Sequence, residues 1–259
     1  MAGPPDRISP QELYKFVGTA NAPVLVDVRR PGAFDADDGL IVGAIRRLPS
    51  EVERWRGELP PSRAVVVYCV HGHEVSQGAD AALAAAGVEA RYLEGGITAW
   101  RESGLPTRRK IGPMPGKWVT RERPKVDRIA CPWLIRRFID PEAEFLYVPS
   151  AEVRDVAERT GAIPYDITGA EFGHVDDHCS FDAFIRLFEL RDAALDRLAL
   201  IVRGADTGRP ELTPQSPGLV ALAYGLSDNF ADDHAMLEAG MIVYDALYAW
   251  CRRDAGAAD

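Results

Sequence analysis

One cysteine stands where a buried strand is expected to give way to a helix. Cys69 follows the run 64–68, which is rich in β-branched residues, and the alanine-rich stretch 77–86 comes soon after it. Free N–H groups at a helix N-terminus, with their partial positive charge, stabilise a thiolate relative to a thiol. The placement therefore predicts a reactive nucleophile at Cys69.

A second group of chemistry-bearing side chains lies in the other half of the chain. Glu171, His174 and Cys179 stand close together, and His234 begins the last predicted helix on its apolar face. Carboxylate, imidazole and thiolate groups are ligands of divalent transition metals. We predict a site for Zn, Fe or Mn at Glu171, His174 and His234, with Cys179 or Asp206 nearby. The alternative is a long loop whose histidines only form hydrogen bonds.

Composition and charge narrow the class of protein. The 259 residues are 47% hydrophobic and 27% charged, which suits two domains with a core each. A net charge of -9 disfavours nucleic acid as a partner of the whole chain. No apolar run approaches the roughly 20 residues that cross a bilayer, and the first residues lack a signal-peptide pattern. We therefore expect no membrane partner.

The four cysteines point to a compartment. They are widely spaced and include no CxxC pair. In a chain of this length that spacing is typical of reduced thiols rather than of a disulfide framework. We therefore expect a cytoplasmic protein.

Strand and helix patterns alternate through the first half. Strands are expected at 24–29, 64–68 and 90–93, helices at the start of the chain from Ser9-Pro10, at 50–55, at 77–86 and after Gly95-Gly96, and a loop at 39–48. Such alternation predicts an α/β domain whose parallel sheet is flanked by helices.

Several motifs in this half occur in the order found in one family. They are Val26-Asp27-Val28-Arg29, the segment 43–45, the Cys69 loop, and the segment 93–100 with Gly104-Leu105-Pro106. Together they resemble a rhodanese, or sulfurtransferase, domain over residues 6–108, and the loop resembles that of the single-domain thiosulfate sulfurtransferases. Position 75 is Val, so the Cys-x5-Arg pattern of related phosphatases is absent.

The resemblance implies a double displacement at Cys69. The cysteine would take sulfur from a small donor as a persulfide, and a thiol acceptor would remove it. Backbone N–H groups of the loop would bind the anionic donor. The substrate-binding residues are then Val70, His71, Gly72, His73, Glu74 and Val75. Because Glu74 is acidic and the loop has no basic residue beyond its histidines, a persulfide donor is favoured over the thiosulfate dianion.

A stretch rich in Pro, Gly and charge at 109–117 predicts a linker between domains at 1–108 and 118–259. Strands are expected at 118–120 and 145–149, and helical patterns fill most of the remaining length. The second domain should therefore be mostly helical, of the α+β class.

Cys131 precedes Pro132, which could occupy the first position of a helix, although Asp127 could also begin an earlier turn. Either start predicts a favoured thiolate at Cys131.

The second half also carries a resemblance. Segments 128–139, 171–182 and 201–206 are similar to the C-terminal domain of the chromate-resistance protein B family, over about residues 117–255. That resemblance implies a role in the sensing or handling of chromate. The regulatory members carry a DNA-binding region where this chain has its rhodanese-like domain.

Three functional hypotheses follow. The leading one is a sulfurtransferase in which Cys69 forms a persulfide and Cys131 and Cys179 are candidate acceptor thiols. The second is an oxyanion sensor or regulator, whose rhodanese-like domain is a binding module and whose DNA-directed feature is the basic pair Arg136-Arg137. The third is a chromate reductase that uses thiols or a metal.

Overall fold

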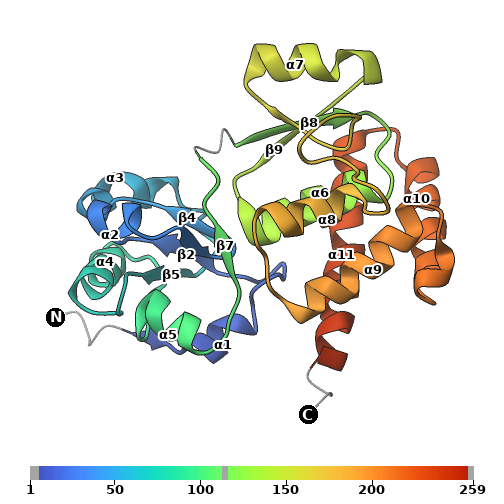
Figure 1. Cartoon of the computed structure of the whole chain (residues 1–259). Helices are drawn as coiled ribbons and strands as arrows, with labels where there is room; N and C mark the ends of the chain where they lie inside the picture. Colours follow the sequence, from blue (N-terminus) through green and yellow to red (C-terminus); the bar gives the residue numbers. More distant parts are fainter. Residues whose placement is uncertain (1–5, 113–115, 256–259) are drawn as a thin grey trace. The chain divides into compact units, whose positions relative to one another are not determined.

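The computed structural model describes residues 6–112 and 116–255 (Figure 1). The N-terminal segment examined for a signal peptide lies, apart from its last residue, outside the described residues, and so does 113–115 of the predicted linker. The chain divides into two compact units, Met1–Lys110 with Arg137–Pro141 and Ile111–Arg136 with Glu142–Asp259.

The first unit is built on a five-stranded parallel sheet in the order β1-β6-β5-β2-β4. Its strands are β1 Arg7–Ile8, β2 Val24–Asp27, β4 Ala44–Arg46, β5 Val65–Tyr68 and β6 Ala90–Leu93. Its helices are α1 Pro10–Tyr14, α2 Pro31–Asp35, α3 Val52–Trp55, α4 Glu74–Ala85 and α5 Gly96–Glu102, with 3-10 turns at Pro49–Glu51 and Arg56–Glu58. The predicted α/β class is therefore confirmed.

The sheet is covered on both faces, which explains its continuous apolar strands. Val65 and Val67 of β5 share one core cluster with side chains of α3 and α4, while α1 and α5 lie side by side, where the Tyr14 and Trp100 rings meet edge to face at 6.2 Å (Figure 1). All four residues of β5 are buried. Such a strand must end where the chain can turn, and the residue after it is Cys69.

Two differences from the sequence prediction concern short elements. The expected loop at 39–48 contains β3 Gly39–Ile41, which pairs antiparallel with β7 Thr107–Arg109, and it also contains β4. Runs of three residues interrupted by a glycine carry too little periodicity to be recognised. Helix α4 begins at Glu74, three residues before the predicted start. Its first turn therefore belongs to the Cys69 loop region.

A buried ion pair stands at the carboxyl end of β2. The Arg29 guanidinium donates to Asp27 Oδ2 at 2.6 Å, and both side chains are fully buried. Arg29 also pairs with Asp37 at 2.7 Å and donates to the Gly39 carbonyl at 2.9 Å. Because Asp27 lies opposite Tyr68 in the parallel register, this network braces the edge of the sheet from which Cys69 emerges.

The second unit is mostly helical and includes a three-stranded parallel sheet in the order β10-β8-β9. Its strands are β8 Lys117–Arg121, β9 Glu144–Val148 and β10 Ile163–Pro164. Its helices are α6 Asp127–Leu134, α7 Val153–Thr160, α8 Ser180–Leu187, α9 Ala193–Asp206, α10 Ser216–Asn229 and α11 Asp233–Ala255, with 3-10 turns at Ser150–Glu152 and Pro210–Leu212. A π-helical turn at Ile135–Ile139 follows α6, and its last three residues belong to the first unit. The predicted class is confirmed here too.

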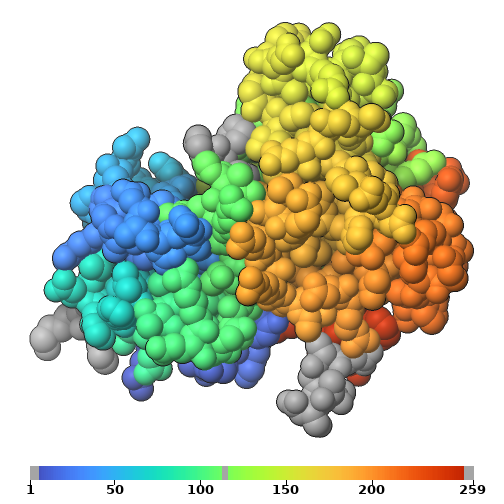
Figure 2. Space-filling model, viewed as in Figure 1, coloured from blue at the N-terminus to red at the C-terminus, as the bar shows by residue number. Residues whose placement is uncertain are grey.

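Helix α7 shows how this small sheet is covered. Val153 and Val156 of α7 pack with Val119 of β8, whereas most of the other α7 side chains are exposed. The yellow helix in Figure 2 accordingly presents its outer side to solvent. None of the helices within the described ranges is long and apolar enough to cross a membrane.

Helix α6 starts at Asp127, so the earlier of the two starts considered from the sequence is the observed one. Pro132 then lies inside the helix and cannot donate to the carbonyl of Arg128. The Tyr147 hydroxyl of β9 donates to that carbonyl instead, at 3.2 Å. The sheet therefore supplies the hydrogen bond that the proline removes.

We expect Asp27→Asn to lower the free energy of unfolding of the first unit by about 3 kcal/mol or more, because it weakens the pairing of a fully buried guanidinium. Urea unfolding followed by circular dichroism measures the loss. Glu94→Gln, which breaks the exposed pair with Arg7, is the control and should cost less than about 1 kcal/mol. Equal losses in the two variants would contradict the bracing role.

Candidate functional site

Cys69 lies at the carboxyl end of β5, immediately before the loop that leads into α4. The residue is only 6% exposed. Its Sγ forms a hydrogen bond of 3.2 Å with Oγ of Ser76, which stands in the first turn of α4. The thiol is therefore surrounded by the Cys69 loop and the first turn of α4.

These surroundings change the pKa of the Cys69 thiol. Burial opposes the charged form, but hydrogen bonds from the Ser76 hydroxyl and from the backbone N–H groups of Ser76, His71 and His73 outweigh it. Together they hold the pKa of Cys69 below its ordinary value. The surroundings of Cys69 thus favour its thiolate more than those of an ordinary cysteine do.

A glycine turn holds the loop from outside. The N–H of Ile97 donates to the Cys69 carbonyl at 3.0 Å, and the N–H of Thr98 donates to the Val70 carbonyl at 3.1 Å. Gly96 has a φ of 60°, and a Cβ at that position would collide with both of these carbonyls. The Gly-Gly-Ile-Thr segment of the sequence therefore fixes the shape of the Cys69 loop.

Charged and imidazole side chains surround the mouth of the loop. Glu74 pairs with Arg30 at 2.7 Å, and both side chains are largely exposed. His71 Nδ1 lies 3.3 Å from Thr98 Oγ1, and the rings of His71 and His73 are 6.0 Å apart. Sequence reasoning missed Arg30, because only the parallel pairing of β2 with β5 brings it beside a loop some 40 positions later. Its charge offsets that of Glu74.

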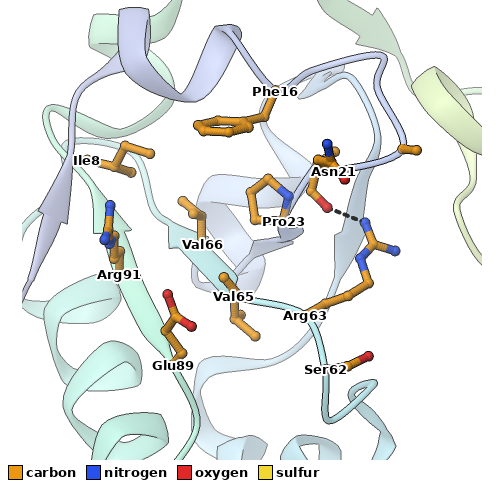
Figure 3. Close-up of a pocket in the computed structure, with 13 residues that line it drawn as sticks. Ile8, Phe16, Asn21, Pro23, Ser62, Arg63, Val65, Val66, Glu89 and Arg91 are labelled. Carbon is orange, nitrogen blue, oxygen red and sulfur yellow. Dashed lines mark hydrogen bonds between the residues drawn. The ribbon is translucent and has the colours of Figure 1, made fainter. Parts of the chain in front are cut away.

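A cavity of about 370 Å³ lies in the same unit, at the amino ends of β2, β5 and β6 (Figure 3). In this view Phe16 lies above Val66 and Pro23 lies beside it, and Arg63 donates to the Ala22 carbonyl. Its lining includes no cysteine or histidine. Because Cys69 follows the carboxyl end of β5, this cavity is not part of the Cys69 site.

In the second unit, one histidine nitrogen faces three carboxylates. His174 Nε2 lies 3.1 Å from Asp206 Oδ2, 3.3 Å from Asp166 Oδ1 and 3.5 Å from Asp127 Oδ2. Asp127 is the first residue of α6, Asp206 is the last of α9, and the other two residues lie in the segments after β10. Among the described residues, Asp127, His174 and Asp206 form a group whose side chains could hold a metal ion.

Burial and the close approach of several charged groups shift the pKa values of the residues in this cluster. Burial first, and then the carboxylate of Asp206, raises the pKa of Asp127 to about 7. Hydrogen bonds with Asp127, Asp166 and Asp206 raise the pKa of His174 to about 12. Burial opposes the charge on Asp166, but hydrogen bonds from His174 and Arg121 outweigh it and lower the pKa of that carboxyl.

The predicted ligand set is only partly assembled. His174 belongs to the observed group, and Asp206, expected nearby, is a member as well. Glu171 is exposed and lies outside the group, while the ring of His234 packs edge-on against Tyr147 at 5.5 Å. Nothing in the spacing of the sequence indicated Asp127 as a ligand, because only the packing of α6 against the 166–180 segment brings it to His174.

The two thiols predicted as acceptors are both buried, with no measurable exposure. Cys131 lies one turn inside α6, where burial first and the Asp127 carboxylate second raise its pKa well above the ordinary value. Burial and the same carboxylate also raise the pKa of Cys179, whose Sγ donates to Asp182 at 3.4 Å. The stabilised thiolate expected at Cys131 is therefore not observed, since the residue is not at the helix N-terminus.

Comparison with known proteins yields matches for both units. Residues 118–251 match the ChrB C-terminal domain, and residues 9–103 match the rhodanese-like domain. A rhodanese-related protein from Thermoplasma volcanium is 30% identical in sequence, with 39% of this chain and 96% of that chain covered and a TM-score of 0.35.

Two curated relatives are similar over part of their length. Protein ChrB of Cupriavidus metallidurans is 38% identical over 133 residues, which are 51% of this chain and 40% of that protein. An uncharacterised protein of Synechocystis sp. is 35% identical over 104 residues, which are 39% of this chain and 54% of that protein. The chain thus spans about half the length of these relatives. Because the ChrB match covers more than half of its residues, the chain belongs to the ChrB C-terminal domain family and carries a rhodanese-like domain in its first half.

Proposed function

We propose that the chain is a sulfurtransferase that carries sulfur as a persulfide on Cys69, within the chromate-related role that its ChrB domain implies. The supporting observation is the environment of the thiol: a cysteine at the end of a buried strand, with a lowered pKa and backbone N–H groups directed at its sulfur. These are the properties of a nucleophile rather than of a core cysteine.

The reaction has two balanced steps. The Cys69 thiolate attacks the transferable sulfur of the donor, and the new S–S bond forms as the bond between that sulfur and the rest of the donor breaks. The remainder leaves with the electron pair, as a thiolate from a persulfide, as sulfite from thiosulfate or as the enolate of pyruvate from mercaptopyruvate. An acceptor thiolate then attacks the outer sulfur of the persulfide and regenerates the Cys69 thiolate. The N–H groups of His71, His73 and Ser76 would stabilise the negative charge on the loaded sulfur.

The surroundings of the thiols favour particular partners. Glu74 at the loop mouth is paired with Arg30, so neither residue offers an unpaired positive charge to a dianion, and we propose a small persulfide as a better donor than thiosulfate. Cys131 and Cys179 are fully buried and have raised pKa values. We therefore propose a small external thiol as the acceptor, in preference to either of these residues.

A DNA-directed role receives less support. Arg136, half of the basic pair noted in the sequence, forms an ion pair with Glu238 at 2.5 Å, and its guanidinium lies over the Phe145 ring. This side chain is engaged within its own unit. The enzyme hypothesis therefore stands ahead of the sensor or regulator hypothesis.

The second unit is proposed to work with a divalent metal, and Zn, Fe and Mn are the candidates. Two carboxylates and one imidazole brought together from three segments are ligands that suit these ions. This part of the proposal is independent of sulfur transfer, and each can fail without the other.

Incubation with thiosulfate, mercaptopyruvate or a small persulfide should add one sulfur atom to Cys69, as seen by mass spectrometry of the peptide that contains it. Cys69→Ser should abolish both the added sulfur and the transfer to a thiol acceptor. Cys251→Ser is the matched control, because this buried cysteine lies in α11, and it should leave loading unchanged. If none of the three donors loads the wild-type protein, the domain is a binding module and the enzyme proposal is wrong.

The Ser76 hydroxyl lowers the pKa of Cys69, so Ser76→Ala should raise it. The rate of alkylation by iodoacetamide rises with pH as the thiolate forms, and its midpoint should move upward by roughly 0.5–1 pH units, the equivalent of one hydrogen bond. Ser76→Thr keeps a hydroxyl and should restore most of the original profile. A downward shift in the alanine variant would contradict the assignment.

Metal analysis of protein purified without chelator should find Zn, Fe or Mn at a substantial fraction of one ion per chain. Dialysis against a chelator should remove the ion and lower the melting temperature, because a ligand that binds only the folded state stabilises it. Cys69→Ser should keep the same metal content. A wild-type protein that neither contains nor takes up any of the three ions would contradict the metal proposal.

A further inference from the structure

We infer that Asp127, His174 and Asp206 bind a single divalent cation in an open site, with Asp166 outside the coordination sphere as a positioning residue. This rests on the proposal that the second unit holds a metal, and it goes further by naming the ligands, the ligand class and the side from which the ion is reached. Glu171, His234 and the thiols take no part.

The distances already resemble those around a cation. Two atoms bonded to the same ion at about 2.1 Å lie roughly 3.0–3.4 Å apart at octahedral or tetrahedral angles. His174 Nε2 is 3.1 Å from Asp206 Oδ2, within that range, and 3.5 Å from Asp127 Oδ2, which belongs to the same carboxylate as the proposed ligand atom Oδ1. The three ligand atoms lie within 4.8 Å of one another. Small side-chain movements would therefore suffice to bind the ion.

Two of the three carboxylates in the cluster, Asp127 and Asp206, form no ion pair with an arginine or lysine in the described part of the chain. Asp166 pairs with Arg121 at 2.8 Å and with Arg128 at 3.3 Å, so its charge is balanced by arginines. The ion pairs found for Asp127 and Asp206 in the described part of the chain are those with His174. A divalent cation that takes the place of the proton on His174 Nε2 would balance these two carboxylates, which like-charge repulsion otherwise disfavours at such short range.

An orphaned oxygen provides an independent reason. The Asp127 side chain is only 1% exposed, and its Oδ1 atom has no hydrogen-bond partner among the described residues. A buried polar atom without a partner costs free energy, and native proteins seldom leave one. Since this carboxylate belongs to the cluster around His174, a bound cation would satisfy the orphaned oxygen.

Hydrogen bonds orient both carboxylates for this task. The N–H of Ser180 donates to Asp127 Oδ2 at 2.6 Å, and the N–H of Asp127 contacts Asp206 Oδ1 at 3.4 Å. Each carboxylate thus has one oxygen fixed by a backbone N–H and another left for a ligand. Ser180 Oγ also donates to Asp166 Oδ1 at 3.0 Å, which holds this third carboxylate in place. Outer contacts of this kind orient metal ligands in proteins.

Exposure of the three ligands shows that the site is open on one side. The side chain of Asp127 is 1% exposed, that of Asp206 17% and that of His174 43%. Three protein ligands leave at least one position of the ion free, as in catalytic rather than structural metal sites. Since the ligands are two oxygens and one nitrogen, that free position would take water or an oxygen-donor anion.

Binding of Mn²⁺ to chelator-treated full-length protein, followed by the loss of the electron paramagnetic resonance signal of free Mn²⁺, tests the ligand set. We expect Asp206→Asn and His174→Ala each to weaken binding more than about a hundredfold, beyond the range that loss of an outer partner typically costs. Asp166→Asn should have a smaller effect, and the matched controls Glu171→Gln and His234→Gln should bind like wild type. Circular dichroism of each metal-free variant distinguishes loss of a ligand from loss of fold.

Co²⁺ substitution tests the ligand class. We expect weak visible bands that change when an oxyanion such as phosphate is added, without the intense near-ultraviolet band of a cobalt–thiolate bond. A thiolate band, or weakened binding in Glu171→Gln or His234→Gln with none in Asp206→Asn, would overturn this ligand set while leaving the metal proposal intact. Failure of wild type to bind Zn²⁺, Fe²⁺, Mn²⁺ or Co²⁺ would instead remove both.

Discussion

A carboxylate removed from water must find a positive charge, and the two units meet this constraint in different ways. In the first unit, Asp27 is paired with the equally buried Arg29. In the second unit, Asp127 is just as deeply buried, yet its partner is the half-exposed His174. Burial of a charge without a matched and hydrogen-bonded partner is costly, so it is maintained mainly where it serves a function. The first arrangement stabilises a fold, and the second has the features of a binding site.

The cysteines also show that a buried negative charge, here a thiolate, depends on the groups around it. All four are buried, so burial alone does not separate them. Around Cys69 the hydrogen bonds come from N–H and O–H donors, whereas neighbouring carboxylates add to the effect of burial in raising the pKa values of Cys131 and Cys179. One thiol is therefore made more acidic and two are made less acidic. Burial raises the pKa at all three sites, and only at Cys69 do hydrogen bonds to the sulfur outweigh it.

The sequence predicted the features that local pattern determines. The buried run 64–68 placed a strand before Cys69, and strand–helix alternation gave the parallel sheet of the first unit. It also identified His174 as a candidate ligand. Local pattern could not identify Asp127, because its role depends on where α6 packs and no spacing rule relates it to a histidine 47 positions later. For the same reason, the sequence pattern suggested Glu171 as a ligand, because this residue is close to His174 in the sequence. The observed ligand candidate Asp127 is close to His174 only in the folded structure.

The turn at Gly95 and Gly96 has a consequence for the energetics of the Cys69 loop. Since backbone hydrogen bonds from Ile97 and Thr98 hold the loop carbonyls, the N–H groups around the sulfur are already oriented before any donor arrives. The entropy of ordering them is lost when the chain folds and would not be lost again in each turnover of the proposed sulfur transfer. A loop without regular secondary structure can in this way be as preorganised as a helix, with little reorganisation of its dipoles as charge moves on to the sulfur.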